Sequence, residues 1–390
     1  MPIKKIIDGN TAVCEAMRQI NPDVVGAFPI TPTTKIMEKF SEFVAQKKVE
    51  TELVLAESEH ASMSICVGAA AGGGRAMTAT ASQGLELMHE VLFNASGMRL
   101  PIVLINGNRA LGAPLSIHPS HCDIMAIRDT GWIQLHAKNA QEAYDLTLQA
   151  FRIAENLKVR TPVVIAMDGF QITHTEQKVQ IEDDKIVKKF LGKVITQDPL
   201  LDVNNPVSYG AAVKPDFFME FKRSQLQGLL NSEKVILEIG REFKTIFKRD
   251  YTQHGETFAL EDAEMAIVCL GSIFGTVCAG ITELRKKGIK IGALRLRSFR
   301  PFPDKFIQKK LTKIKNIAIL ERVSPSGATG GPLFIEIRSA LFEQKNNIIP
   351  FTTSLGGREF FPQHVKEIFK ILEKKQKINF KETFWINLRK

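Results

Sequence analysis

The sequence predicts an α/β fold with a mostly parallel sheet, followed by a second and smaller α/β unit. Short apolar runs of strand length alternate with longer stretches that carry apolar residues at helical spacing. This alternation is typical of parallel sheets with helices on both faces. It fades after residue 172 and resumes near residue 261. A chain of 390 residues suits two domains. We therefore expect one domain over 1–240, a linker over 241–260 and a second domain over 261–390.

The elements expected in the first domain follow this alternation. Residues 8–20 begin with N-cap residue types and continue at helical spacing. Further helices are expected at 35–44, 60–73, 85–96 and 140–155, and strands at 24–28, 53–56, 77–80, 102–105, 132–136 and 161–167. Residues 112–129 predict a loop, because they hold two prolines and two histidines. Residues 182–206 predict a connecting segment, and 217–247 a helix that packs back on the first domain.

The second domain repeats the pattern at smaller scale. Strands are expected at 266–270, 291–296, 317–320 and 348–353. Helices are expected at 275–287 and between the Gly330-Gly331 pair and residue 341.

The net charge of +10 raises the question of nucleic acid. The basic residues are spread out, aromatic residues are not interleaved with them, and no nucleic-acid motif is present. The charge therefore indicates a solvated surface, or a face for an acidic partner protein, and no nucleic acid.

The five cysteines are scattered and form no CxxC pair. This spacing argues against a disulfide framework and against an iron–sulfur cluster in this chain. No apolar run approaches the roughly 20 residues that span a bilayer, and the N-terminus lacks the pattern of a secretory signal. We expect a cytoplasmic protein that does not enter a membrane.

Polar stretches follow three of the expected strands, at residues 27–34, 57–61 and 106–110. Ligand sites of α/β folds lie at the carboxyl ends of parallel strands. We therefore expect Thr31, Glu59 and Arg109 to converge on one site. Spacing alone also allows Glu59 to be an ordinary helix N-terminal glutamate and Arg109 a surface ion pair. Glu57, two residues earlier, is the alternative to Glu59.

The stretches FPITPTT (28–34), ESEHA (57–61), TASQG (80–84) and NRA (108–110) occur in that order, followed by RDTGW, LRSFRPFP and SLGGRE. In this combination the chain resembles the α subunit of the 2-oxoacid:ferredoxin oxidoreductases, and among them pyruvate:ferredoxin oxidoreductase (pyruvate synthase). The resemblance covers nearly the whole chain. It implies a pyrimidine-binding-type domain of thiamine diphosphate enzymes, followed by a transketolase C-terminal-like domain.

The resemblance also implies roles for single residues. Glu59 would hydrogen-bond the aminopyrimidine ring of thiamine diphosphate and activate the cofactor, with Ile30 and Ser82 beside it. Thr31 and Arg109 would hold the 2-oxoacid carboxylate, which the planar guanidinium fork suits. The turn Ser82-Gln83-Gly84 would lie at the subunit contact that builds the cofactor cleft. Asp168-Gly169 is interpreted as a strand-end turn.

The loop 117–123 carries two histidines, a cysteine and an aspartate. Their spacing matches no common zinc pattern, so we expect no metal site. Family members commonly carry Gly-Asp-His where this chain has Pro119-Ser120-His121. His121 is retained as a substrate-binding candidate, and this departure leaves the preferred 2-oxoacid open.

The resemblance implies a reversible reaction that converts pyruvate, coenzyme A and oxidised ferredoxin into acetyl-CoA, carbon dioxide and reduced ferredoxin. This sequence shows no Gly-Asp-Gly…Asn diphosphate motif. A β subunit would therefore hold the diphosphate and Mg²⁺, and γ- and δ-type subunits the [4Fe-4S] clusters and coenzyme A contacts. The alternatives are the same chemistry on branched-chain 2-oxoacids or 2-oxoglutarate, or a non-catalytic scaffold subunit that keeps the fold.

Overall fold

A computed structural model describes residues 2–194, 196, 198–374 and 383–389. The larger of its sheets has seven strands in the order β12-β6-β7-β5-β4-β2-β3. All of its neighbouring pairs are parallel except the edge pair of β12 and β6. The strands are β2 (Val24–Ala27), β3 (Glu52–Leu55), β4 (Ala76–Thr80), β5 (Val103–Asn108), β6 (Ile133–His136), β7 (Val163–Asp168) and β12 (Ser298–Arg300).

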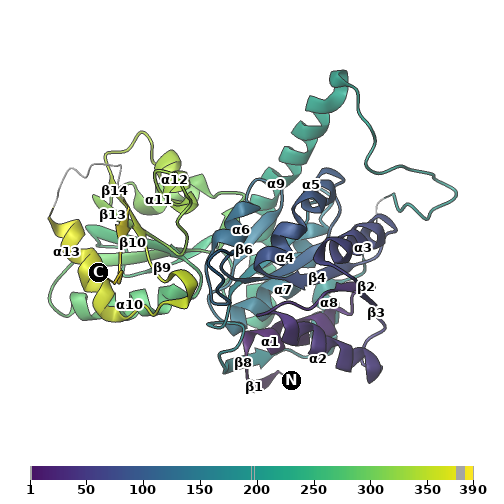
Figure 1. The fold of residues 1–390 in the computed structure, drawn as a ribbon, viewed down its shortest axis with the longest axis horizontal. Coiled ribbons are helices and arrows are strands. Elements are labelled where there is room, and N and C mark those ends of the chain that lie inside the picture. The colour runs from purple at the N-terminus through teal and green to yellow at the C-terminus, as the bar shows by residue number, and fades with distance from the viewer. Residues whose placement is uncertain (1, 195, 197, 375–382, 390) are drawn as a thin grey trace.

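Helices cover both faces of this sheet (Figure 1). Side chains alternate between the faces, so that Met77 and Ala79 of β4 join one apolar cluster and Ala76 joins the other. The first cluster includes α1 (Gly9–Ile20), α2 (Thr34–Ala45), α7 (Ala140–Ala154), α8 (Asp184–Leu191) and part of α9 (Pro215–Phe247). The second includes α3 (Glu59–Ala71), α4 (Ser82–Leu87), α5 (His89–Gly97) and α6 (Cys122–Ala126).

The second sheet has six strands in the order β15-β14-β13-β10-β11-β9, and only β9 runs antiparallel to its neighbour in this described part. The strands are β9 (Gly255–Phe258), β10 (Met265–Leu270), β11 (Ile291–Leu296), β13 (Asn316–Glu321), β14 (Asn347–Thr352) and β15 (Phe384–Trp385). One face packs on α10 (Phe274–Arg285) and α13 (Pro362–Glu373), the other on α11 (Asp304–Leu311) and α12 (Pro332–Ala340). The predicted α/β class with mostly parallel sheets is confirmed.

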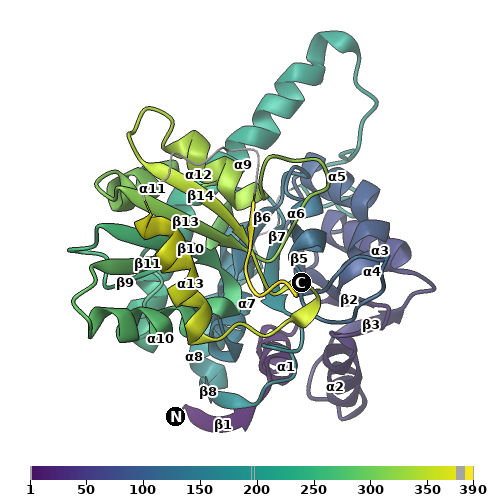
Figure 2. The same ribbon diagram turned by 60° about the vertical axis from the view of Figure 1, so that its left-hand side comes forward.

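The two units lie side by side (Figure 2), and they share one cluster of buried apolar side chains. The cluster on the α3–α6 face of the first sheet continues without interruption into β10, β11, α11 and α12. In addition, β12 lies after β11 in the chain but pairs with β6 of the first sheet, with Ser298 opposite Leu135. The units are therefore joined both by a strand and by buried apolar side chains.

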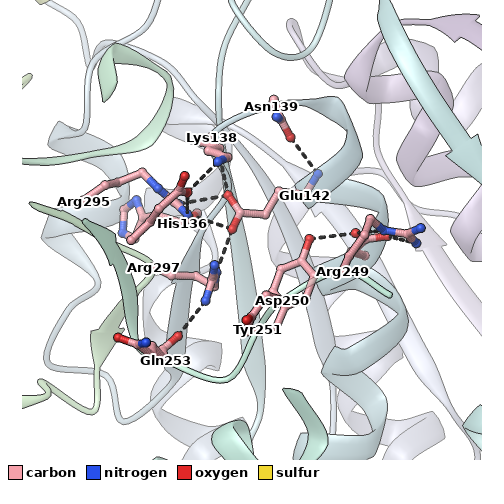
Figure 3. Close-up of polar contacts among 12 residues, drawn as sticks. His136, Lys138, Asn139, Glu142, Arg249, Asp250, Tyr251, Gln253, Arg295 and Arg297 are labelled. Atoms are coloured by element: carbon pink, nitrogen blue, oxygen red, sulfur yellow. Dashed lines mark hydrogen bonds and ion pairs between the residues drawn. The ribbon is translucent and has the colours of Figure 1, made fainter. Parts of the chain in front are cut away.

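A buried carboxylate network adds a polar tie between the units (Figure 3). Glu142 of α7 accepts from both Nη atoms of Arg295 at 2.9 Å and from Nε of Arg297 at 2.6 Å. Burial acts to raise the pKa of Glu142, but the two guanidinium groups outweigh it and lower that pKa to about 2. Glu142 is therefore charged over the physiological pH range.

The structure corrects four expectations about single elements. Residues 182–206 are not only a connection, since α8 begins at Asp184 and buries Val187, Phe190 and Leu191. Its eight residues are too few, and too rich in lysine, to show a clear period. The predicted loop 112–129 contains α6, and the predicted helix 85–96 is two helices that meet at Met88. The structure also contains a two-stranded sheet that was not predicted from the sequence, in which β1 (Ile3–Ile7) pairs with β8 (Gln177–Ile181).

The fourth correction concerns the long helix α9, whose first half is mostly exposed. Its second half buries Val235, Ile239 and Phe243 in the first cluster, as predicted. Its first half projects from the body of the molecule (Figure 1). There, four apolar side chains on different sides of the helix are more than half exposed, namely Phe217, Phe218, Met219 and Phe221. No described helix is both long enough and apolar enough to cross a membrane.

Candidate functional site

The carboxyl ends of β2, β3, β4 and β5 lie along one edge of the first sheet, because these strands are neighbours and parallel. The predicted residues follow from that edge. Glu59 is the first residue of α3, and the hydroxyl of Ser58 caps this helix by accepting from the amide of Ala61 at 3.1 Å. The cap fixes the backbone of Glu59 at the sheet edge.

Glu59 is 7% exposed, and its carboxylate accepts no hydrogen bond from any residue that the structure describes. The residue is largely buried, while its carboxylate oxygens are not among the described buried polar atoms that lack a partner, so they remain open to a donor from outside this chain. The helix dipole at the start of α3 favours its negative charge.

Gly84 keeps the space in which this carboxylate lies. A Cβ atom on Gly84 would come within 2.5 Å of Glu59 Oε1 and 2.6 Å of Thr80 Oγ1. The Thr80 hydroxyl is buried and also lacks a partner in the described part of the chain. The carboxylate of Glu59 and the hydroxyl of Thr80 therefore lie on the same side of Gly84. The sequence pointed to the Ser82-Gln83-Gly84 turn but not to this role of Gly84 or Thr80.

Asp123 links the ends of β4 and β5. Its Oδ2 accepts from the backbone amides of Ser82 and Arg109, both at 3.0 Å, and from Nδ2 of Asn106 at 3.1 Å. Burial raises the pKa of Asp123 to about 6. Ser82 itself is buried and adopts a left-handed backbone with φ of 51°. Its hydroxyl donates to the carbonyl of Ala110 at 2.6 Å, so Ser82 fixes the backbone here.

Arg109 and Thr31 meet as predicted from their strand ends. Nη1 of Arg109 donates to the carbonyl of Thr31 at 3.0 Å, and Nε approaches the carbonyl of Ser116 at 3.4 Å. Its Nη2 has no acceptor among the described residues, and no described carboxylate pairs with it. The hydroxyl of Thr31 is likewise without a described partner and the residue is exposed, while Ile30 is half-buried beside it.

His121 is held differently from the expectation. It is 2% exposed, and its Nε2 lies 2.7 Å from Oδ1 of Asp168. Asp168 also accepts from Arg322 Nη1 at 2.8 Å and from the hydroxyl of Ser272 at 2.6 Å, both in the second unit. Burial acts to raise the pKa of Asp168, but Arg322 and His121 hold it well below its ordinary value. Asp168 ends β7 and Gly169 begins a turn, as expected, and Asp168 is in addition a buried anion at the junction of the units.

Other concave regions lie away from this edge. A pocket of about 460 Å³ lies around the Glu142 network, lined among others by Lys138, Arg249 and Tyr251. Another of about 530 Å³ lies between α5 and the projecting half of α9. Among the described residues, no cluster of three or more histidine, cysteine or acidic side chains is arranged to hold a metal ion.

The fold and the polar side chains along this edge define an α/β subunit with a candidate ligand site at the carboxyl ends of its parallel strands. Residues 15–241 match the family model described as pyruvate flavodoxin/ferredoxin oxidoreductase, thiamine diphosphate-binding, and residues 263–365 match pyruvate:ferredoxin oxidoreductase core domain II. The chain belongs to this family of oxidoreductases, as its motifs predicted.

Individual relatives agree with the family. The chain is 45% identical to the pyruvate synthase subunit PorA of Thermotoga maritima, over 93% of both chains. It is 38% identical to the ketoisovalerate oxidoreductase subunit VorA of Pyrococcus horikoshii, over 100% of this chain and 99% of that one. The solved 2-oxoglutarate:ferredoxin oxidoreductase of Magnetococcus marinus has the same fold, with a TM-score of 0.71 and 18% identity over 95% of this chain and 65% of that chain.

Proposed function

We propose that this chain is the α subunit of a multi-subunit enzyme that oxidises pyruvate. Pyruvate and coenzyme A would give acetyl-CoA and carbon dioxide, and the two electrons released would reduce two oxidised ferredoxins, each by one electron. The observation that carries the proposal is that Glu59 and Arg109 both follow strands at one sheet edge, and that neither has a charged partner in the described part of the chain. The identity of 45% to a pyruvate synthase subunit supports it.

The described residues fit thiamine diphosphate. The aminopyrimidine ring presents an amino group and a ring nitrogen, which a glutamate and a neighbouring hydroxyl can bond. Glu59 and Thr80 are such groups: the Thr80 hydroxyl is buried without a partner, and the Glu59 carboxylate accepts no hydrogen bond from a described residue. When bound, the cofactor supplies a carbon nucleophile that attacks the keto carbon of the substrate. Glu59 would share a proton with the ring nitrogen and so favour the reactive tautomer.

Arg109 would bind the substrate carboxylate through its free Nη2, and Thr31 would add a hydroxyl donor. The carbonyl of Thr31 already orients the guanidinium, and Asp123 fixes the backbone of Arg109. Orientation of this kind is worth several kcal/mol of barrier in general. A single arginine matches a monocarboxylate such as pyruvate.

The Glu59 pocket can be tested by placing a methyl group in it through a substitution at Gly84. Gly84→Ala is expected to lower the affinity for thiamine diphosphate about tenfold or more, because the methyl group would displace the Glu59 carboxylate. Titration of the purified complex with the cofactor, read by calorimetry, measures this. Gly275→Ala is the matched control, since its Cβ would meet nothing within 4 Å in helix α10. Equal affinities of the two variants would contradict the pocket assignment.

The remaining functions would belong to other subunits. A β subunit would hold the diphosphate and Mg²⁺, and γ- and δ-type subunits would hold the [4Fe-4S] clusters, bind coenzyme A and pass electrons to ferredoxin in the cytoplasm. Two features support a larger assembly. The relatives are named as subunits. In addition, the first turns of α9 carry exposed apolar side chains on several sides. Exposure of such a surface to water is unfavourable, and another polypeptide can bury it.

A second candidate substrate class is the branched-chain 2-oxoacids, because a ketoisovalerate oxidoreductase subunit is 38% identical over nearly its whole length. Both candidates are tested on the native complex, purified without oxygen through a tag on this chain. We expect reduction of a viologen dye that requires pyruvate and coenzyme A and is slower with 2-oxoisovalerate and 2-oxoglutarate. A higher kcat/KM for 2-oxoisovalerate would favour the second candidate, and no reduction with any acid would refute both.

A further inference from the structure

The loop of residues 110–121 lies against the Arg109 side chain, and contacts with the second unit hold this loop in place. Arg109 Nε approaches the carbonyl of Ser116, and the amide of Ala110 donates to the carbonyl of His118 at 3.1 Å. Residues 110–121 therefore contact the Arg109 side of the proposed substrate site. This loop carries three exposed or half-exposed apolar side chains at positions 111, 115 and 117.

Three hydrogen bonds to Arg322 and Gly357 fix the far end of this loop. The amide of His121 donates to the carbonyl of Arg322 at 2.8 Å, and the hydroxyl of Ser120 donates to the same carbonyl at 3.0 Å. The amide of Gly357 approaches the carbonyl of Pro119 at 3.3 Å. Arg322 follows β13 and Gly357 follows β14, so every one of these partners comes from the second unit.

The buried anion Asp168, which belongs to the first unit, connects the loop to the second unit. It is 1% exposed and bonds both His121 of the loop and Arg322 of the second unit. Ser272 closes the cluster from the turn after β10. Two residues beyond His121, Asp123 holds the amides of Arg109 and Ser82. A continuous set of buried polar contacts thus runs from the second unit to the backbone of the proposed carboxylate-binding residue.

We propose that Asp168 is a positioning residue of the substrate site: by bonding His121 and Arg322 it fixes the 110–121 loop, so that the second unit sets the shape of the 2-oxoacid pocket. The inference rests on the proposed function of Arg109 and deepens it. It also gives His121 a different part from direct substrate binding, because its Nε2 is occupied by Asp168 and its side chain is buried.

The test compares two buried carboxylates that both join the units. Asp168→Asn removes the anion that locks the loop, whereas Glu142→Gln removes one that bonds Arg295 and Arg297 and does not touch the loop. In the purified complex we expect Asp168→Asn to raise KM for pyruvate about tenfold and to leave kcat within about threefold, because the binding group is displaced and the chemistry is not. Glu142→Gln should change neither.

A second readout does not depend on activity. Hydrogen exchange at the amides of Ala110 and His121 is expected to be about tenfold faster in Asp168→Asn than in the native complex, and unchanged in Glu142→Gln. Unchanged exchange and KM in Asp168→Asn, or equal changes in both variants, would overturn the proposal. A wild-type complex that oxidises no 2-oxoacid would refute the proposed function instead, and the exchange comparison would still decide whether Asp168 locks the loop.

Loss of Asp168 leaves the buried Arg322 cation without its partner, which in general costs about 3–5 kcal/mol. If that variant does not assemble, Ser120→Ala replaces it as the test, since it removes the hydroxyl that donates to the Arg322 carbonyl and accepts from the amide of Cys122 at 3.3 Å. The expected result is faster exchange at His121 and a KM for pyruvate raised about threefold. No change in either quantity would overturn the proposal.

Discussion

Replacing Glu59 by glutamine is expected to lower kcat roughly a thousandfold while the complex still assembles, since general acid–base catalysis by one placed group contributes about 10²–10⁴. Glutamine keeps the size of the side chain but cannot share a proton with the cofactor ring. The carboxylate has no bond to any described residue, so little folding free energy should be lost with it. Steady-state dye reduction at saturating pyruvate, coenzyme A and thiamine diphosphate measures the effect.

Glu57→Gln is the matched control for this experiment. Glu57 lies two residues earlier, is exposed and precedes the cap of α3, so its replacement should leave kcat within about twofold. A thermal unfolding curve of each complex shows whether both variants remain folded. Near-normal turnover in Glu59→Gln, or a loss in Glu57→Gln instead, would show that the glutamate was assigned wrongly.

Arg109→Ala should lower kcat/KM for pyruvate about a hundredfold, mainly by raising KM. A charge-assisted hydrogen bond contributes roughly 1.5–3 kcal/mol, and the substrate carboxylate would lose at least one of them. The alanine variant also frees the carbonyl of Thr31, which the guanidinium now bonds. Initial rates over a range of pyruvate concentrations, with the other substrates saturating, give the two kinetic constants separately.

Two comparisons make the arginine result specific. KM for coenzyme A should stay the same in Arg109→Ala, because coenzyme A does not present its reacting group to this clamp. Arg285→Ala makes the same change of charge in the second unit, where Arg285 pairs with Asp262 at 2.7 Å, and should not affect pyruvate. If KM for pyruvate did not change in Arg109→Ala, the carboxylate-binding role would be refuted.

The parts of the fold with strong periodicity could be predicted from the sequence. Strands β2, β4, β5, β7 and β10 are apolar runs bounded by polar residues, and their order gave the parallel sheets. Short elements could not be found in this way. In α8 three buried residues stand among three lysines, and β12 has three residues whose pairing with β6 depends on how the units pack.

In the candidate site, too, some residues could be predicted from the sequence and others could not. The strand-end rule placed Thr31 and Arg109 together, and the structure brings them into contact at 3.0 Å. It could not reveal Asp123 or Asp168, because their partners lie up to 154 residues away in the chain. A buried aspartate that bonds distant amides has the same sequence signal as one in a turn. The role of Gly84 likewise depends on the packing of Glu59 and Thr80 against it.

One apolar cluster runs from α3–α6 into β10, β11, α11 and α12. This cluster limits how the chain can be divided or its units exchanged. A break in the gene near residue 250 would expose half of that cluster on each fragment, and neither fragment would keep a complete core. Exchanging the second unit for that of a relative would therefore require compensating substitutions on the first.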